Sequence, residues 1–253
     1  MSAHERALPS TGDLAAEDAE RVLARGEIAL HGLVPWSSNF TFIVSVRDAD
    51  DELLAIYKPS RGERPLWDFP PGTLCRREVA AYLVSRHLGW PDIPPVVLRN
   101  GPHGTGSVQL FVAADQEEHY LTLRNRPEYE DAFRRIALFD DLVNNADRKS
   151  GHVLKGSRGR LWAIDHGLTF HVEPKLRTVI WEYAGQRLCA DWLGELHALQ
   201  GALEGRGALY TALAALISAQ EVDAFRRRLA QRAKAGVFPL PRRNWRNVPY
   251  PVV

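Results

Sequence analysis

One stretch decides the fold of this chain: Asn144-Asn145-Ala146-Asp147-Arg148-Lys149-Ser150-Gly151-His152-Val153-Leu154. Apolar residues at helical spacing precede it, between positions 133 and 143, and predict a helix that leads into the stretch. Two short apolar runs on either side of residues 155–159 predict a hairpin that ends at Asp165. The hairpin would bring Asp147 and Asp165 to the same side of this small sheet. Two acids and an imidazole at one site could hold a divalent metal and accept a proton.

Length and composition bound the remaining possibilities. The 253 residues suffice for one large domain or for two lobes with cores of their own. The net charge of +1 gives no indication of nucleic-acid binding. The cysteines, Cys75 and Cys189, are too few for a disulfide framework, so we expect a cytoplasmic protein.

The two ends of the chain carry different signals. The N-terminus lacks the apolar core of a signal peptide, and no apolar run approaches the roughly 18 residues of a transmembrane segment. Residues 239–253 are rich in proline and arginine, with aromatic residues interleaved. This tail is predicted to pack on the surface of the protein, although peripheral contact with an anionic membrane stays possible. The residues that would make such contact are Arg242, Arg243, Trp245, Arg246 and Tyr250.

Hydrophobic patterning in the first half predicts a short leading helix, followed by a small, mostly antiparallel sheet with one helix. The expected helices are 13–25 and 73–88, and the expected strands are 27–34, 40–46, 53–58, 96–98 and 108–112. The second half is predicted to be largely helical, with helices at 128–143, 187–204, 208–218 and 220–234. The fold class is therefore α+β. A change in composition near residues 112–116 predicts a boundary between a lobe at 1–112 and a lobe at 113–253.

Lys58 lies at the end of a predicted strand, on the same face as Leu54 and Ile56. A lysine there either extends into solvent or is held inside for a purpose. Glu78 borders the apolar stripe of the predicted helix 73–88 and would point partly inward. The two side chains would form an ion pair if both face the space between sheet and helix.

These features resemble a kinase. The segments Asn145-Ala146-Asp147-Arg148 and Ile164-Asp165-His166-Gly167 look like the paired motifs of the phosphatidylinositol 3-/4-kinase-like group. The sequence of residues 144–154 is similar to that of a bacterial branch of the group. Neither His-Arg-Asp nor Asp-Phe-Gly, the triplets of ordinary protein kinases, occurs. The resemblance covers roughly residues 30–185 and implies a two-lobed protein-kinase-like fold and an ATP-dependent phosphotransferase.

The resemblance implies a role for each motif residue. Asp147 would be the catalytic aspartate that accepts the proton of the acceptor hydroxyl, and Arg148 would screen charge near the transferred phosphoryl group. Asp165 would bridge a metal ion to the phosphates. Lys58, oriented by Glu78, would neutralise the α- and β-phosphates.

Two further segments would bind ATP according to the resemblance. Ser37, Ser38 and Asn39 occupy the position of a phosphate-covering turn, where they would offer hydroxyl and backbone amide groups. Gln109, Leu110, Phe111 and Val112 occupy the hinge position, where backbone groups usually receive adenine.

The chain departs from the kinase pattern at His152, where an asparagine is expected as the second metal ligand. Imidazole favours ions other than Mg²⁺, so we expect Mn²⁺ to be preferred if His152 is a ligand. An unperturbed histidine would also cause activity to fall as the pH drops through about 6.5.

The sequence leaves the acceptor open. A protein serine or threonine, a lipid, or a small molecule could each offer the hydroxyl group. The alternative to an enzyme is a pseudokinase that senses nucleotide or binds a protein partner. Asp147, Lys58 and Asp165 favour the enzyme, whereas His152 favours the pseudokinase.

Overall fold

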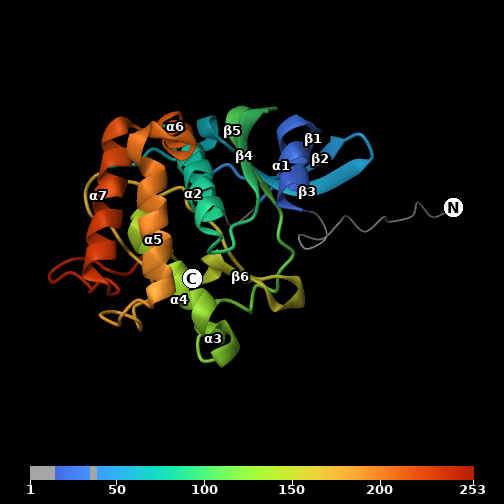
Figure 1. The fold of residues 1–253 in the computed structure, drawn as a ribbon. Helices are drawn as coiled ribbons and strands as arrows, with labels where there is room; N and C mark the ends of the chain where they lie inside the picture. Colours follow the sequence, from blue (N-terminus) through green and yellow to red (C-terminus); the bar gives the residue numbers. More distant parts are fainter. Residues whose placement is uncertain (1–14, 35–38) are drawn as a thin grey trace.

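A computed structural model describes residues 15–34 and 39–253. One side of the molecule is a five-stranded antiparallel sheet, and the other side is mostly helical (Figure 1). The strand order in the sheet is β1-β2-β3-β5-β4. The strands are β1 (Glu27–Leu33), β2 (Phe42–Asp48), β3 (Asp51–Pro59), β4 (Val96–Gly101) and β5 (Gly104–Leu110). The predicted antiparallel sheet is confirmed, and within it β2 and β3 form one hairpin and β4 and β5 form another.

The turns of these hairpins are tighter than the sequence predicted. Strand β2 runs to Asp48 and β3 begins at Asp51, so only two residues connect them. The first of these, Ala49, has a φ of +54°, as a two-residue hairpin turn requires. The sequence predicts a turn over residues 47–52, because charged residues at the ends of strands resemble the polar residues of a loop. In the structure their backbones pair, Arg47 with Glu52 and Asp48 with Asp51.

Helix α1 (Ala16–Arg25) covers the sheet. Its apolar side chains Ala19, Val22 and Leu23 are fully buried with residues of β2, β3 and β5. Helix α2 (Leu74–Leu88) packs against β4 and β5 and also against two helices of the other half. It ends at Gly89, whose φ of +76° suits glycine. Because α2 contacts both halves, its side chains can link them.

The second half contains five helices and a short hairpin. The helices are α3 (Tyr120–Leu123), α4 (Glu130–Val143), α5 (Ala190–Leu203), α6 (Ala208–Ala214) and α7 (Ala219–Ala235), and the hairpin is β6 (Val153–Lys155) with β7 (Leu161–Ala163). Short 3₁₀ helices lie at Ser60–Gly62, Pro127–Tyr129, Ser150–His152, Ser157–Gly159 and Glu204–Arg206. The sequence missed α3 and predicted α6 four residues too long. The reason for the second error is that Ser218 caps the start of α7.

The core of the second half is continuous with α2. Side chains of α4, α5 and α7 pack with those of α2 in a single hydrophobic cluster. No helix in the described part of the chain is both long enough and apolar enough to cross a membrane.

Candidate functional site

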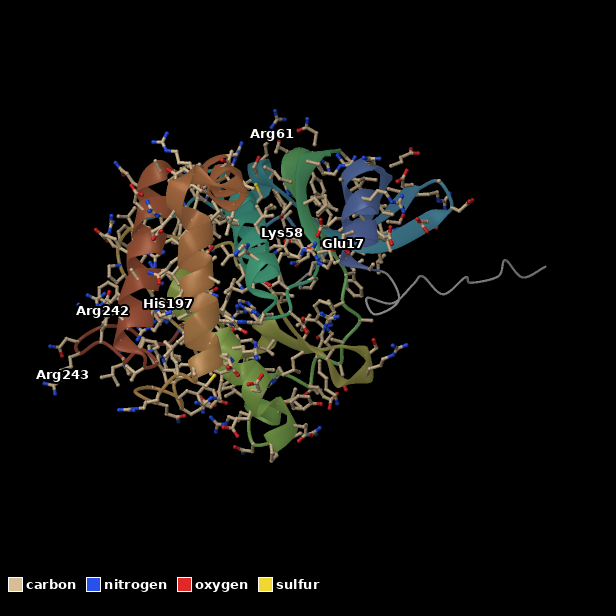
Figure 2. The ribbon with its side chains drawn as sticks, viewed as in Figure 1. Glu17, Lys58, Arg61, His197, Arg242 and Arg243 are labelled. Carbon is tan, nitrogen blue, oxygen red and sulfur yellow. The ribbon has the colours of Figure 1, made fainter. Side chains whose placement is uncertain are left out.

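Lys58 lies near the end of β3 and points toward the helical half. Its Nζ donates to Glu78 Oε1 at 2.7 Å and to Asp165 Oδ1 at 3.1 Å. The predicted ion pair of Lys58 with Glu78 is confirmed, and Lys58 also pairs with Asp165. Burial alone would lower the pKa of Lys58, but Asp165 and Glu78 outweigh it and raise the pKa well above the usual range. Lys58 therefore carries a fixed positive charge, in the middle of the molecule (Figure 2).

Glu78 comes from α2 and is buried. While Oε1 accepts from Lys58, Oε2 accepts the backbone N–H of His166 at 3.0 Å. One carboxylate thus orients the lysine and also holds the residue after Asp165. Burial raises the pKa of Glu78, and the Lys58 charge opposes that rise. The predicted inward direction of Glu78 is confirmed.

Asp165 lies two residues beyond the end of β7, at the end of the small hairpin. Its Oδ1 contacts Lys58, and its Oδ2 lies 3.2 Å from Nε2 of His152. Burial raises its pKa, but Lys58 and His152 more than reverse this effect and hold the pKa well below the usual range. Asp165 is therefore an ionised carboxylate, and its side chain is 44% exposed. It is chemically suited to a hard cation.

The His152 ring lies beside the Asp165 carboxylate and is mostly buried, with 14% of its side chain exposed, and it is not among the residues that line the cavity described below. Burial lowers the pKa of His152 to about 4, and the opposing effect of Asp165 is smaller. The ring is thus neutral at physiological pH and can act as a ligand. The expectation that it titrates near pH 6.5 is wrong, because a buried ring close to several cations resists protonation.

Asp147 lies in the loop between α4 and the hairpin. Its backbone N–H donates to Asn145 Oδ1 at 3.0 Å, and its Oδ2 lies 3.2 Å from Lys149 Nζ. Burial raises the pKa of Asp147 to about 6, although the Lys149 charge opposes it. Near neutral pH this carboxylate can accept a proton, which is the property required of a general base.

Arg148 does not have the predicted position. Its guanidinium group is fully buried and faces away from the cleft, toward Asp140 of α4. Nε donates to Asp140 Oδ2 at 2.9 Å, and Nη1 donates to the carbonyl oxygens of His152 and Ile164. Nη2 contacts Asp140 and Nε2 of His166. Arg148 therefore ties the loop to the hairpin, and it cannot screen a phosphoryl group in the cleft.

Sequence reasoning missed three residues that shape this loop. Asn144 ends α4 with a φ of +56°, and its side chain bonds the backbone of His171, Glu173 and Lys175. Asn145 joins Asp140 to the backbone of Asp147. The doubled asparagine was a usable signal, because asparagine tolerates left-handed backbone and caps helix ends. Asp140 gave no signal, since its spacing does not distinguish it from an exposed helix residue.

A cavity of about 240 Å³ is lined by four of the charged groups, Lys58, Glu78, Asp147 and Asp165. It lies between the end of β3, the start of α2 and the loop that carries Asp147. Its lining combines the charged residues with apolar ones from the β3–α2 connection. The lining residues are Asn39, Phe40, Lys58, Pro59, Glu63, Arg64, Leu66, Leu74, Cys75, Glu78, Asp147, Asp165, Gly167 and Leu168.

The predicted phosphate-covering turn is described only in part. Ser37 and Ser38 lie outside the described residues. Asn39 borders the cavity, and its Oδ1 accepts the backbone N–H of Arg64 at 2.7 Å. Phe40 N–H donates to the Gly62 carbonyl oxygen at 3.0 Å. The end of the turn is therefore fastened to the β3–α2 connection.

The predicted hinge, Gln109 to Val112, lies at the end of β5 and just beyond it. The Leu110 amide donates to the Pro95 carbonyl oxygen, and the Phe111 amide donates to the Leu54 carbonyl oxygen. Those two amides are already engaged, so adenine would have to use other groups of this stretch. The residues lining the 240 Å³ cavity do not include 109–112.

The donor set fits a nucleotide-bound metal. No three His, Cys, Asp or Glu side chains form a ready cluster anywhere in residues 15–34 and 39–253. Mg²⁺ in phosphoryl-transfer sites typically takes one or two carboxylates and completes its shell with water and phosphate oxygens. Asp165 supplies an ionised carboxylate, and the neutral His152 lies beside it. These residues can hold a metal that arrives with the nucleotide.

The predicted packing of residues 239–253 on the protein is confirmed. The Asn247 carbonyl oxygen accepts from Thr178 N–H and from Trp181 Nε1, each at 3.0 Å. The Val252 carbonyl oxygen accepts Ser150 N–H at 2.8 Å, within the loop that follows Asp147. Arg242 and Arg243 lie at the edge of the molecule, away from Lys58 in the view of Figure 2.

Two solved kinase structures resemble this chain in fold. The crystal structure of the Helicobacter pylori proinflammatory kinase CtkA matches with a TM-score of 0.51 at 12% identity, over 85% of this chain and 94% of its own. The golgi casein kinase matches with a TM-score of 0.54 at 15% identity, over 87% of this chain and 74% of its own. The predicted α+β, two-lobed kinase-like fold is confirmed.

Sequence comparison adds a relative that is much more similar. No protein-family model matches the chain. Protein Rv2133c of Mycobacterium tuberculosis is 40% identical over an alignment of 268 positions, and the alignment covers 93% of this chain and 95% of that protein. Because this identity extends over nearly the whole of both proteins, the chain belongs to the same family as Rv2133c.

Proposed function

We propose that this protein is an ATP-dependent phosphotransferase that transfers the γ-phosphoryl group to a hydroxyl acceptor. One observation carries the proposal: the Lys58 ammonium joins Glu78 at 2.7 Å and Asp165 at 3.1 Å, beside a cavity that Asp147 also lines. A fixed cation, an ionised carboxylate and a carboxylate of raised pKa within one cavity are the groups that phosphoryl transfer requires.

Lys58 would neutralise the α- and β-phosphates of ATP, because Glu78 and Asp165 keep its ammonium charged and directed into the cleft. Asp165, with His152 beside it, would hold the divalent metal, Mg²⁺ or Mn²⁺. The metal supplies positive charge that offsets the charge developing on the β- and γ-phosphate oxygens.

Asp147 would act as the general base. The acceptor oxygen forms a bond to the γ-phosphorus, and the bond from that phosphorus to the β-bridging oxygen breaks. ADP leaves with the electron pair of the broken bond, and Asp147 Oδ takes the acceptor proton. Asn145 would hold the backbone of Asp147 in position and Lys149 its carboxylate.

ATP would lie between a lobe at 1–112 and a lobe at 113–253. Asn39, and with it Ser37 and Ser38, would cover the phosphates. Backbone groups of the stretch 109–112 would receive adenine, as the resemblance to kinases implies. The engaged amides of Leu110 and Phe111 restrict which of those groups can do so.

The resemblance of residues 145–148 and 164–167 to the phosphatidylinositol 3-/4-kinase-like group supports an atypical kinase. It leaves three acceptor classes: a protein serine or threonine, a lipid, and a small molecule. Outward-facing Arg242 and Arg243 support peripheral contact with anionic lipid, whereas the bonds of Asn247 and Val252 support a packed tail.

The test is transfer of label from γ-labelled ATP, with Mg²⁺ and with Mn²⁺, to cell lysate and to lipid extract. Label should reach an acceptor with the natural protein and should not with Asp147→Asn. Label transfer at equal rates by both proteins would exclude Asp147 as the base.

The second candidate is a pseudokinase, and one observation favours it: an imidazole stands at the position of the second metal ligand. Under this proposal the protein binds ATP, and no acceptor in either extract becomes labelled. Equilibrium binding of ATP together with the labelling assay separates the two candidates.

A further inference from the structure

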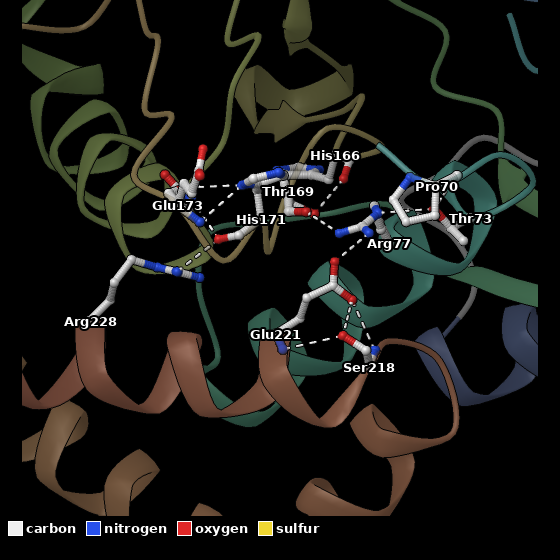
Figure 3. Close-up of polar contacts among 11 residues, drawn as sticks. Pro70, Thr73, Arg77, His166, Thr169, His171, Glu173, Ser218, Glu221 and Arg228 are labelled. Atoms are coloured by element: carbon white, nitrogen blue, oxygen red, sulfur yellow. Dashed lines mark hydrogen bonds and ion pairs between the residues drawn. The ribbon is translucent and has the colours of Figure 1, made fainter. Parts of the chain in front are cut away.

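Arg77 precedes Glu78 on α2, and its guanidinium group is buried. The side chain is 1% exposed. Nη2 donates to Glu221 Oε1 at 2.5 Å, Nη1 donates to the Thr169 carbonyl oxygen at 2.7 Å, and Nε donates to Thr73 Oγ1 at 3.3 Å. Figure 3 shows these contacts converging from α2, α7 and the segment after Asp165.

Glu221 is fixed by its own helix as well as by Arg77. It is the third residue of α7, and its Oε2 accepts from the backbone N–H and the hydroxyl of Ser218 at 2.9 and 2.8 Å. Ser218 Oγ accepts the Glu221 amide in return, which completes a capping box. The Glu221 carboxylate therefore has little freedom, and it presents its other oxygen to Arg77.

The segment from Asp165 to Thr169 is held at both ends by neighbouring residues of α2. Glu78 Oε2 accepts the His166 amide at 3.0 Å, and Arg77 Nη1 donates to the Thr169 carbonyl oxygen. Within the segment, Thr169 Oγ1 donates to the His166 carbonyl oxygen at 2.7 Å. Two consecutive side chains of α2 thus hold the turn, and one hydrogen bond within the turn stabilises it further.

This turn carries backbone strain at the proposed metal ligand. Asp165 has a φ of +60°, in the left-handed region that is uncommon for residues other than glycine, although aspartate and asparagine enter it more readily than most. Such a conformation persists only when the surrounding structure imposes it. The bonds from Glu78 and Arg77 supply that constraint, and Glu221 compensates the charge of Arg77 in a buried environment.

We propose that Arg77 and Glu221 form a positioning clamp, through which the start of α7 fixes Asp165 for metal-nucleotide binding. Neither residue lines the cavity. The clamp acts on Asp165 through the turn 165–169, in the way that residues hydrogen-bonded to a metal ligand orient that ligand. The inference rests on the proposed function, since it assigns metal-nucleotide binding to Asp165.

The test compares ADP binding in Mn²⁺ with ADP binding in EDTA, measured by calorimetry. Glu221→Gln keeps the shape of the side chain and removes its charge. It should weaken ADP binding in Mn²⁺ by roughly tenfold and leave binding in EDTA unchanged. The control is Asp141→Asn, which breaks the 2.6 Å pair with Arg232 between α4 and α7. This control should leave the ratio of the two dissociation constants at the natural value.

Amide hydrogen exchange tests the clamp in the free protein. Residues 165–169 should exchange faster in Glu221→Gln than in the natural protein, and they should not in Asp141→Asn. If Glu221→Gln does not fold, Arg77→Lys replaces it, because lysine keeps the charge and loses the fork that reaches both partners. Unchanged binding ratios and unchanged exchange at 165–169 would overturn the clamp. Failure of the natural protein to bind ADP would overturn the proposed function, and exchange would still decide the clamp.

Discussion

Two networks of opposite charges lie back to back in this molecule. In the cleft, Lys58 joins Glu78 and Asp165, and Asp147 lies on the wall of the same cavity. Behind it, Arg148 joins Asp140. Distances in the two networks are similar, but both partners of the Arg148 pair are 0% exposed, whereas the Asp165 side chain is 44% exposed.

The difference separates a structural network from a site for chemistry. Every nitrogen of the Arg148 guanidinium has a partner within the fold. The cleft has charge left over: Asp165 is ionised and partly open, and the pKa of Asp147 is raised to about 6. Residue types alone do not distinguish the two networks, because each contains a cationic side chain paired with a carboxylate. What distinguishes the cleft network is that its carboxylates lie next to a cavity and can still form bonds.

The largest expected effect comes from removing the base in the cleft. Asp147→Asn should reduce phosphoryl transfer by roughly 10²–10⁴-fold, because amide nitrogen cannot accept the proton. ATP binding should stay within a few-fold of the natural value, since Lys58 and Asp165 remain. Labelled-phosphate transfer and equilibrium ATP binding are the two measurements.

The same variant should be more stable than the natural protein above pH 6. The folded-state pKa of Asp147 lies above its ordinary value of 3.8, so ionised Asp147 costs folding free energy at neutral pH. The gain in unfolding free energy should be about 3 kcal/mol at pH 7.5, which is the shift from 3.8 to about 6 at about 1.4 kcal/mol per pKa unit. It should disappear as the pH falls below about 4, where both states are protonated. Urea melts at the two pH values measure it, and a loss of stability at pH 7.5 would contradict the raised pKa.

The second prediction breaks the buried network. Asp140→Asn should lower the free energy of unfolding by about 3–5 kcal/mol, because it leaves the Arg148 charge buried without compensation. The control is Asp131→Asn on the same helix, which removes an exposed pair with Arg135 and should cost under about 1 kcal/mol. Equal effects of the two substitutions in urea melts would mean that the Arg148 pair is not closed off from solvent.

The third prediction concerns acid pH. Because the base must be ionised, transfer should fall about tenfold per pH unit below about pH 6, as Asp147 becomes protonated. His152 should not contribute above pH 5, since its pKa is lowered to about 4. A pH–rate profile of kcat/KM measures the midpoint. His152→Asn should leave that midpoint in place, and a midpoint that moves with this variant would assign it to the histidine.

The smallest expected effect is on metal preference. His152 Nε2 lies 3.2 Å from Asp165 and is neutral, so nitrogen ligation should favour Mn²⁺ over Mg²⁺. His152→Asn should lower the ratio of Mn²⁺- to Mg²⁺-supported activity by roughly threefold to tenfold. An unchanged ratio would show that the metal does not contact residue 152.

The cleft network was largely predictable from the sequence. Strand alternation placed Lys58 on one face, the helical stripe placed Glu78 beside it, and the hairpin brought Asp165 to the same mouth. Each of these steps uses a period of two or of 3.6 residues, which tertiary packing rarely changes. His152 followed from counting along the loop after Asp147.

The buried network was not predictable, and Arg148 shows why. An arginine next to a catalytic aspartate has the same sequence context whether it faces the cleft or the core. Its direction depends on Asp140, which lies eight residues earlier on α4 and looks like an ordinary charged helix residue. Arg77 and Glu221 are a similar case, since 144 residues separate them and no periodic pattern relates them. Long-range pairs of this kind depend on how helices pack.

The positive φ of Asp165 bears on how the family can lose activity. At φ +60° aspartate, asparagine and glycine are tolerated, whereas alanine or valine adds steric cost to the loss of the carboxylate. The backbone requirement therefore persists after the chemical requirement has gone. Relatives that have stopped transferring phosphate should carry asparagine or glycine at this position. The same reasoning makes Asp165→Asn the sound choice for an inactive laboratory variant, because Asp165→Ala would confuse a missing ligand with a misfolded turn.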